Sequence, residues 1–208
     1  MKPSSTRQRR TLRVKLGAVV AAALLALAVS AGTAQACSYT GAEKVFSRWG
    51  DPHSYVPGPD GGFEAGAEGW SLNGGARPVK GNESYYLHGA RDSHSLYLPG
   101  GSSAASPAIC MSIDTPVLRM FVRNSGYSSS RLRVEAIYSL QGVLHTDVVN
   151  DVRSGSSWAP TQEMSVVLGL STILGTVTPS SIQVRITPVD ELGKWQVDDF
   201  YVDPFARH

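Results

Sequence analysis

The sequence of 208 residues predicts an all-β fold, an antiparallel β-sandwich of the jelly-roll type. Apolar and polar residues alternate over about ten short stretches, as strands with one buried face require. Clusters of Gly, Ser, Asn and Pro separate these stretches. No long stretch has the helical periodicity that the crossovers of a parallel sheet would need. Together these observations favour two stacked antiparallel sheets.

The clearest strand covers residues 181–187, where Ile182, Val184 and Ile186 alternate with polar residues. In the stretch 117–123, the same alternation places Arg119 and Arg123 on the solvent side. The other predicted strands are 131–138 and 195–202, with shorter candidates at 71–73, 77–80, 95–98, 105–110, 143–149 and 163–168.

Residues 1–36 have the three regions of a secretory signal peptide. A basic start precedes an apolar run at residues 16–29, and Ala34-Gln35-Ala36 provides a cleavage site. The apolar run is shorter than the roughly 20 residues that span a bilayer as a helix. No later segment is apolar for long enough to span one. We therefore expect a cleaved signal and a secreted protein without a transmembrane segment.

The two cysteines, Cys37 and Cys110, are predicted to form a disulfide, because exported proteins mature where thiols oxidise. The alternative to a disulfide is two unpaired thiols, and a lipoprotein anchored through Cys37, which directly follows the cleavage site, would leave Cys110 unpaired. Ala34, three residues before Cys37, fits ordinary cleavage better than lipoprotein processing.

The remaining chain is predicted to have an irregular leader at 37–61, a sandwich domain at 62–205 and a short tail at 206–208. A helical turn is expected near residues 42–49. Six of the 19 basic residues lie in the signal, which leaves 13 against 17 acidic residues. This slightly acidic balance disfavours a nucleic-acid partner, which requires a concentrated basic surface.

Two segments resemble the opening and closing strands of carbohydrate-binding modules with the galactose-binding-like jelly-roll fold. They are Gly61-Gly62-Phe63-Glu64-Ala65-Gly66, followed by a Trp, and Trp195-Gln196-Val197-Asp198-Asp199-Phe200. The stretch His94-Ser95-Leu96-Tyr97-Leu98 is similar to another strand of that family. The whole chain also resembles actinobacterial single-domain secreted proteins of unassigned function. The first resemblance implies binding of a polysaccharide without catalysis.

The same resemblance implies a structural calcium between the first and last strands, with Glu64 and Asp198 or Asp199 as ligands. Calcium takes oxygen ligands, which carboxylates and the carbonyls of Gly-rich turns supply. Neighbouring strand residues point to opposite faces, so one of the two aspartates is expected to lie inward and need a partner. The alternatives to calcium are a buried ion pair, for which an arginine would serve, and a solvent-facing Asp.

Sugar binding needs aromatic surfaces together with planar polar side chains for the hydroxyl groups. The candidate ligand-binding residues are Tyr85, Tyr86, Trp158, Arg133, Glu135 and Arg185. Trp70 and Trp195 are expected in the core, as is common for Trp in a sandwich. The outward arginines form either a strip for an acidic polymer or an ordinary solvent-exposed face.

The sequence contains no nucleophile elbow and no metal-ligand spacing typical of an enzyme, so no catalytic residue is predicted. His88 and His94 flank Asp92, which is either the start of a metal site or a polar loop. We expect a secreted binding module for a polysaccharide or cell-wall glycan, with calcium as its only candidate cofactor. The alternatives are an adhesive or structural protein that binds another protein, and a glycan-cleaving hydrolase or lyase with two facing carboxylates.

Overall fold

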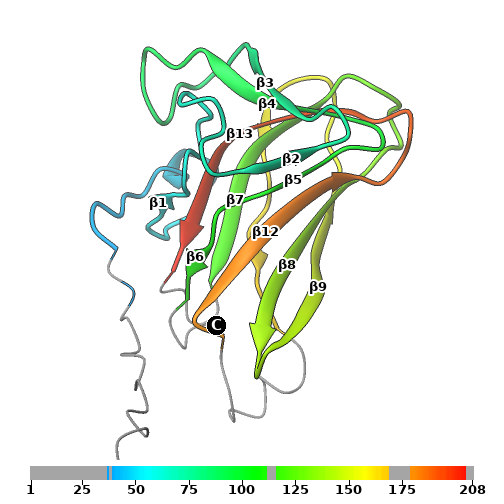
Figure 1. Ribbon diagram of the computed structural model, residues 1–208. Helices are drawn as coiled ribbons and strands as arrows, with labels where there is room; N and C mark the ends of the chain where they lie inside the picture. The colour runs from blue at the N-terminus through cyan, green and yellow to red at the C-terminus, as the bar shows by residue number, and fades with distance from the viewer. Residues whose placement is uncertain (1–36, 38, 112–115, 169–178, 205–208) are drawn as a thin grey trace, which may run out of the picture. The chain divides into compact units, whose positions relative to one another are not determined.

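The computed structural model describes residues 37, 39–111, 116–168 and 179–204 (Figure 1). The predicted signal peptide and tail lie outside these residues. The described residues form two antiparallel sheets and one short 3-10 helix, η1 (Ser47–Trp49). Within this part of the chain, no helix has the length and apolar character needed to cross a bilayer. The predicted all-β jelly-roll sandwich is confirmed.

The first sheet, here called the β13 sheet, has the strand order β10-β7-β13-β4-β3. Strand β1 pairs with the far end of β13, and β11 pairs with β7. Its strands are β1 (Val56–Pro57), β3 (Arg77–Lys80), β4 (His94–Pro99), β7 (Val117–Asn124), β10 (Ala159–Pro160), β11 (Met164–Ser165) and β13 (Lys194–Asp203).

The second sheet, the β12 sheet, has the order β2-β5-β12-β8-β9, with β6 also paired to β12. Its strands are β2 (Ser71–Asn73), β5 (Ser103–Ala105), β6 (Ile109–Cys110), β8 (Leu132–Leu140), β9 (Val143–Val152) and β12 (Ser181–Pro188). Strands β8 and β12 alternate buried and partly exposed residues almost throughout, because one face packs on the core and the other faces solvent.

Residues 105–110 do not form the single strand that the sequence predicted. They contribute the end of β5 and all of β6, which are separated by Ser106, Pro107 and Ala108. Pro107 has no N–H to donate to the ladder. The Val184 N–H of β12 donates a 2.9 Å hydrogen bond to the Ser106 hydroxyl. A side-chain oxygen therefore replaces the backbone carbonyl that would accept this bond in a regular ladder.

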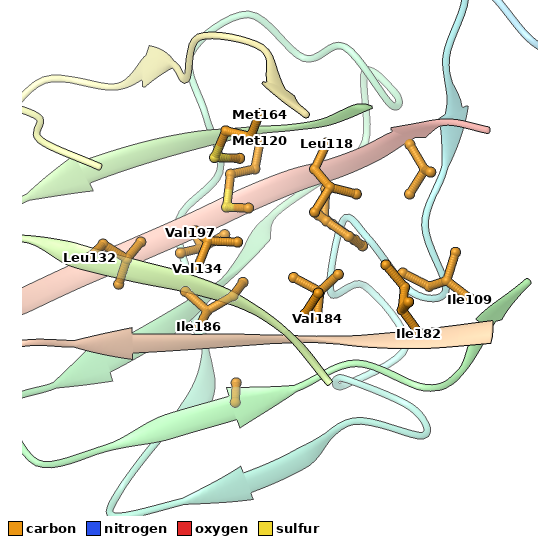
Figure 2. Close-up of a cluster of buried hydrophobic side chains, with 14 of the residues drawn as sticks. Ile109, Leu118, Met120, Leu132, Val134, Met164, Ile182, Val184, Ile186 and Val197 are labelled. Atoms are coloured by element: carbon orange, nitrogen blue, oxygen red, sulfur yellow. The ribbon is translucent and has the colours of Figure 1, made fainter. Parts of the chain in front are cut away.

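The core lies between the inner faces of the two sheets. Figure 2 shows Leu118, Met120 and Met164 of the β13 sheet opposite Val184 and Ile186 of the β12 sheet. Trp70 and Trp195 belong to this core, as predicted. Because each is buried, its indole N–H needs a partner, and these are the carbonyl of Pro59 and the hydroxyl of Ser130.

A second buried cluster covers the outer face of the β13 sheet. Phe46 of the predicted leader stacks on Phe121 of β7 at 5.9 Å between ring centroids, and Tyr55 and Tyr201 join it. Strand β7 is consequently buried on both faces. The prediction that Arg119 faces solvent is therefore wrong, because residues 46–55 cover it. The leader also supplies β1.

The predicted disulfide between Cys37 and Cys110 is present, with 5.6 Å between the Cα atoms. It joins the segment before η1 to strand β6. The Tyr39 hydroxyl donates a hydrogen bond to the Cys110 carbonyl beside it. The disulfide occupies the Cys37 thiol, to which a lipid anchor would have to be attached.

Candidate functional site

The outer side of the β12 sheet brings together three of the predicted ligand-binding residues. Arg185 of β12 pairs in register with Glu135 of β8, and Thr187 pairs with Arg133. Because side chains alternate along each strand, all four point to the same outward face. With the turn at 101–103 and residues 188–189 they line a pocket of about 460 Å³. This surface is called the polar face below.

Ion pairs hold the charged groups of the polar face in fixed orientations. Arg185 Nε lies 2.8 Å from Glu135 Oε2, and Arg133 Nε lies 2.9 Å from Asp151 Oδ1. Arg131 reaches the other oxygen of Asp151 at 2.9 Å. The hydrogen bond from Arg133 lowers the pKa of Asp151.

The predicted aromatic ligand-binding residues lie on the β13 sheet and its connecting loops. Tyr85 and Tyr86 belong to the loop between β3 and β4, where Tyr85 packs on Phe121 and Tyr86 is 53% exposed. Trp158 is buried, with the Arg123 guanidinium 5.0 Å from its ring centroid. The structure therefore does not unite the six candidates. The outward positions of β8 and β12 carry no aromatic side chain.

A second candidate site surrounds the paired aspartates of β13. A register shift between Asp198 and Tyr201 interrupts the ladder, and Asp199 adopts a left-handed backbone conformation with φ of 48°. Both aspartates are consequently buried instead of alternating across the sheet. Asp198 accepts the Glu83 N–H at 2.8 Å and the Asp199 N–H at 2.9 Å. Within the described residues, neither side-chain oxygen of Asp199 has a hydrogen bond of good geometry, although the His88 N–H and the Glu83 side chain lie close enough to affect the Asp199 pKa.

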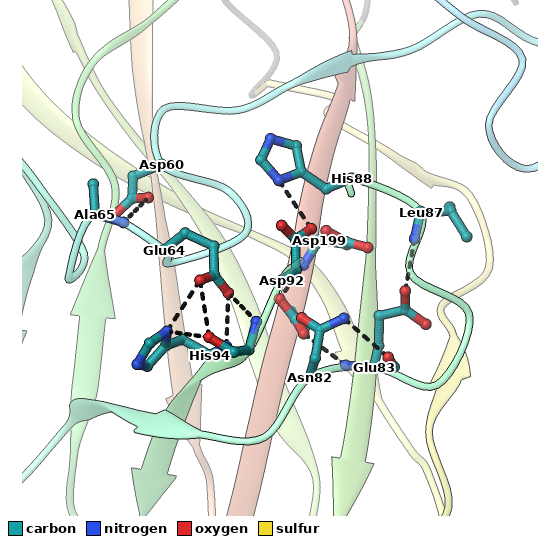
Figure 3. A network of polar contacts seen from close by, with 12 residues as sticks. Asp60, Glu64, Ala65, Asn82, Glu83, Leu87, His88, Asp92, His94 and Asp199 are labelled. Carbon is teal, nitrogen blue, oxygen red and sulfur yellow. Dashed lines mark hydrogen bonds and ion pairs between the residues drawn. The ribbon is translucent and has the colours of Figure 1, made fainter. Parts of the chain in front are cut away.

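The loop between β3 and β4 adds further acidic groups to this cluster (Figure 3). Ligand atoms of His88, Asp92 and Asp199 lie within 4.8 Å of one another. His88 Nδ1 contacts Asp92 Oδ2 at 3.1 Å and thereby orients that carboxylate. Glu83 is fully buried nearby, with its carboxylate accepting the N–H groups of Tyr85 and Leu87. We call Glu83, Asp92, Asp198 and Asp199 the acidic cluster.

Burial without a positive partner strongly affects the acidic cluster. Desolvation, reinforced by the charge of Asp199, raises the pKa of Asp198 to about 9. Desolvation, followed by the charges of Glu83 and Asp92, raises the pKa of Asp199 to about 8. Buried carboxylates without a counter-charge are costly, so a bound cation would relieve their burial. The atoms that converge are one oxygen each of Asp92 and Asp199 and a nitrogen of His88. The oxygens of Asp198 and Glu83 already accept backbone N–H groups. The two converging carboxylate oxygens are the ligands that calcium would use here.

Glu64, the third predicted calcium ligand, makes other contacts. Its carboxylate accepts the N–H groups of Ser93 and His94, each at 2.6 Å, and lies 3.0 Å from His94 Nδ1. Figure 3 shows Glu64 turned toward His94 rather than Asp199. No sequence pattern marks Glu83 as a candidate ligand, and Asp92 is marked only by its flanking histidines.

Comparisons with known proteins bear on the fold. No family model and no curated protein matches this chain. Among solved structures, the CBM22-1 and GH10 modules of Clostridium thermocellum xylanase 10B, complexed with xylohexaose, match with a TM-score of 0.52 and 12% identity. That match covers 74% of this chain and 29% of the other.

Two further solved structures are similar to this chain. The enzymatically active domain of bacteriophage CBA120 tailspike protein 4 matches with a TM-score of 0.51 and 11% identity, over 71% of this chain and 21% of that one. The CBM22-1 xylan-binding domain of Paenibacillus barcinonensis Xyn10C matches with a TM-score of 0.46 and 13% identity, over 65% and 85%. At these identities the likeness concerns the fold, which serves binding and catalytic proteins alike. The chain has the jelly-roll sandwich fold found in carbohydrate-binding modules.

Proposed function

We propose that this protein is a secreted, non-catalytic module that binds a polysaccharide or cell-envelope glycan on the polar face of the β12 sheet. The observation that carries the proposal is the convergence of Arg133, Glu135 and Arg185 on one 460 Å³ pocket. Planar charged groups held by ion pairs present donors and acceptors in fixed geometry, which suits the hydroxyl groups of a sugar chain. Secretion is supported by the signal-like segment 1–36 and by the disulfide.

The arginine pairs also favour binding over cleavage at this surface. A glycosidase acid must be protonated near neutral pH, which requires a raised pKa. Asp151 has the opposite shift, because Arg133 and Arg131 stabilise its ionised form. Glu135 is held by Arg185 at 2.8 Å. Both carboxylates of the polar face are therefore arranged as hydrogen-bond acceptors.

Retention on a panel of insoluble polysaccharides, soluble polysaccharides and purified cell walls tests this proposal. We expect selective retention of the wild type and a loss of about tenfold or more in affinity for Arg185→Gln and Glu135→Gln, since a hydrogen bond to a charged group contributes roughly 1.5–3 kcal/mol. Glu68→Gln, an exposed substitution outside the pocket, is the matched control. The proposal fails if folded protein is retained on no glycan, or if both pocket variants bind like wild type.

One observation favours protein binding as the second candidate. Val143, Leu144 and Val148 of β9 are between 56% and 72% exposed, and β9 is the last strand in the β12 sheet order. Exposed apolar residues on a terminal strand are suited to contacts with another protein. Leu144→Ser would abolish such an interaction and leave glycan retention unchanged, so the same panel separates the two functions.

We also propose that calcium binds the acidic cluster and stabilises the fold. Asp199 carries this proposal, because the charges of Glu83 and Asp92 act on its buried carboxylate and ligand atoms of His88 and Asp92 lie within 4.8 Å of it. A bound cation would hold the β3–β4 loop against β13 by neutralising charges from both. Calcium should raise the melting temperature of the wild type and leave that of Asp199→Asn unchanged. Equal calcium responses in the two proteins would contradict the assignment.

A further inference from the structure

A second pocket lies on the opposite sheet from the polar face. Its volume is about 380 Å³, and it is lined by Trp49, Gly50, Asp51, Arg119, Gln162 and Glu163. This size falls within the range of about 300–1,000 Å³ that is typical of small-molecule sites. Segment 49–51 forms one side, the segment between β10 and β11 forms the other, and β7 supplies Arg119. We call this cavity the Trp49 pocket.

The charged groups of the Trp49 pocket are held rigidly. The side chains of Arg119 and Asp51 are only 7% and 3% exposed and are paired with each other. Arg119 also donates from Nε and Nη2 to the Thr161 carbonyl. These contacts use three of its five guanidinium N–H groups. Asp51 is fixed by the His53 N–H at 2.9 Å and the Tyr55 hydroxyl at 2.8 Å.

The rim combines an aromatic ring with exposed polar groups. Trp49 is half-buried, and T-shaped contacts with Phe121 at 5.3 Å and Tyr85 at 5.1 Å fix its ring. Gln162 and Glu163 are exposed and supply an amide and a carboxylate. An aromatic surface beside planar hydrogen-bonding groups matches the two aspects of a pyranose, its apolar ring hydrogens and its hydroxyl groups.

The balance of charge selects among sugars. Asp51 pairs with Arg119 within the pocket, and the Arg48 guanidinium, 4.8 Å from the Trp49 ring centroid, offsets the charge of Glu163. These four charges balance, which suits a neutral sugar. We propose that the Trp49 pocket is a second saccharide site, which binds a neutral pyranose residue. It shares no residue with the polar face, so either site can fail experimentally without the other.

The test follows the indole N–H signal of Trp49 by two-dimensional NMR. The probes are the methyl pyranosides of glucose, galactose, mannose, xylose and N-acetylglucosamine. The other three tryptophans, Trp70, Trp158 and Trp195, are at most 9% exposed, so they serve as internal references. Trp49→Phe identifies the Trp49 signal with little loss of packing. We expect a saturable shift of this signal with at least one probe.

Two exposed substitutions test the polar groups without disturbing the core. Gln162→Ala and Glu163→Ala should each weaken binding about tenfold, since each removes a hydrogen bond to the sugar. Glu68→Gln should bind the probe like the wild type. No shift of the Trp49 signal with any probe up to its solubility limit would overturn the proposal, as would a shift that both pocket variants retain. If polymer retention is lost in Arg185→Gln but kept in Gln162→Ala, the polymer is bound at the polar face and not at the Trp49 pocket.

Discussion

Arg119 of β7 and Arg185 of β12 both point away from the core between the sheets, but their surroundings differ. The polar face leaves the Arg185 side chain 36% exposed beside Glu135, whereas Phe46 and Tyr55 help to bury Arg119 with Asp51. Ionic pairs of the same chemistry therefore have different energetic consequences, because the buried partners have lost their hydration.

We predict that Asp51→Asn destabilises the protein much more than Glu135→Gln. Removing the charge of Asp51 leaves the Arg119 guanidinium buried with only carbonyl and amide partners, which costs about 3–5 kcal/mol. Glu135 pairs with a partly exposed arginine, where the loss is about 0–1 kcal/mol. Urea denaturation of the two variants measures the difference. Equal midpoints would show that the Arg119 pair has no special role in stability.

The acidic cluster predicts how stability depends on pH. An unfolded aspartate titrates near pH 3.9, whereas the folded-state pKa values are about 9 for Asp198 and about 8 for Asp199. Between these limits the folded protein holds protons that the unfolded chain has released. The free energy of unfolding must therefore fall as pH rises from about 4 through 8 to 9.

Thermal melting in the presence of chelator, measured across this pH window, checks the prediction. Asp199→Asn should flatten the decline because it removes one titrating group, and Asn tolerates the left-handed conformation at this position. Calcium should flatten it in the wild type by stabilising the ionised carboxylates. A melting temperature in chelator that rises steadily with pH would contradict the assigned shifts.

At the level of secondary structure, the long strands could be predicted from the sequence and the shortest could not. Strands β7, β8, β12 and β13 carry the alternation or apolar density that a buried face imposes. Strands β1 and β10 have two residues each, which is too few to show a period. The pattern also could not reveal that Phe46 and Tyr55 cover β7, because contacts between distant segments leave no local signal.

The candidate sites were predictable to a similar extent. Alternation placed Arg133, Glu135 and Arg185 on one face, and the paired aspartates marked the acidic cluster. Trp49 and Glu83 were missed, since each acts through a fold that brings a loop or leader onto a distant strand. Apart from the paired aspartates, the sequence pointed only to Asp92 as a member of the acidic cluster, because it lies between His88 and His94.

The disulfide between Cys37 and strand β6 gives a prediction at the same scale. Its cysteines are 73 residues apart, and closing a loop of this length stabilises a protein by roughly 4 kcal/mol in the chain-entropy model. We expect Cys37→Ser/Cys110→Ser to retain its β-sheet content but to unfold at a clearly lower temperature. Circular dichroism against temperature, for oxidised wild type and the double variant, measures this. Coincident curves would show that β6 does not need the covalent tie.

At the scale of the whole molecule, the candidate sites are divided between the two sheets. The acidic cluster and the Trp49 pocket belong to the β13 sheet and its covering segments, whereas the polar face belongs to the β12 sheet. The hydrophobic core between the sheets separates the polar face from the other two sites. Each surface can therefore change without rearranging the core.

This separation predicts that the proposed calcium takes no part in binding at the polar face. Its effect would be on stability alone. Chelator should lower the melting temperature, yet retention on a glycan should be unchanged at temperatures where the chelated protein is still folded. Affinity electrophoresis at two temperatures, one on each side of the chelated transition, distinguishes these effects. Loss of retention below the transition would mean that the cation bridges protein and ligand.

The Cys37–Cys110 bond also determines what a protease can release. The covalent loop that it closes contains strands β1 to β5 and the long β3–β4 connection. A single nick anywhere inside that loop leaves both fragments attached to the same molecule. Nicked protein would migrate near full length on a denaturing gel without reductant and separate into two pieces when thiol is added. Outside the cell, where proteases are common and reductants scarce, such a molecule keeps all of its surfaces together after being cut.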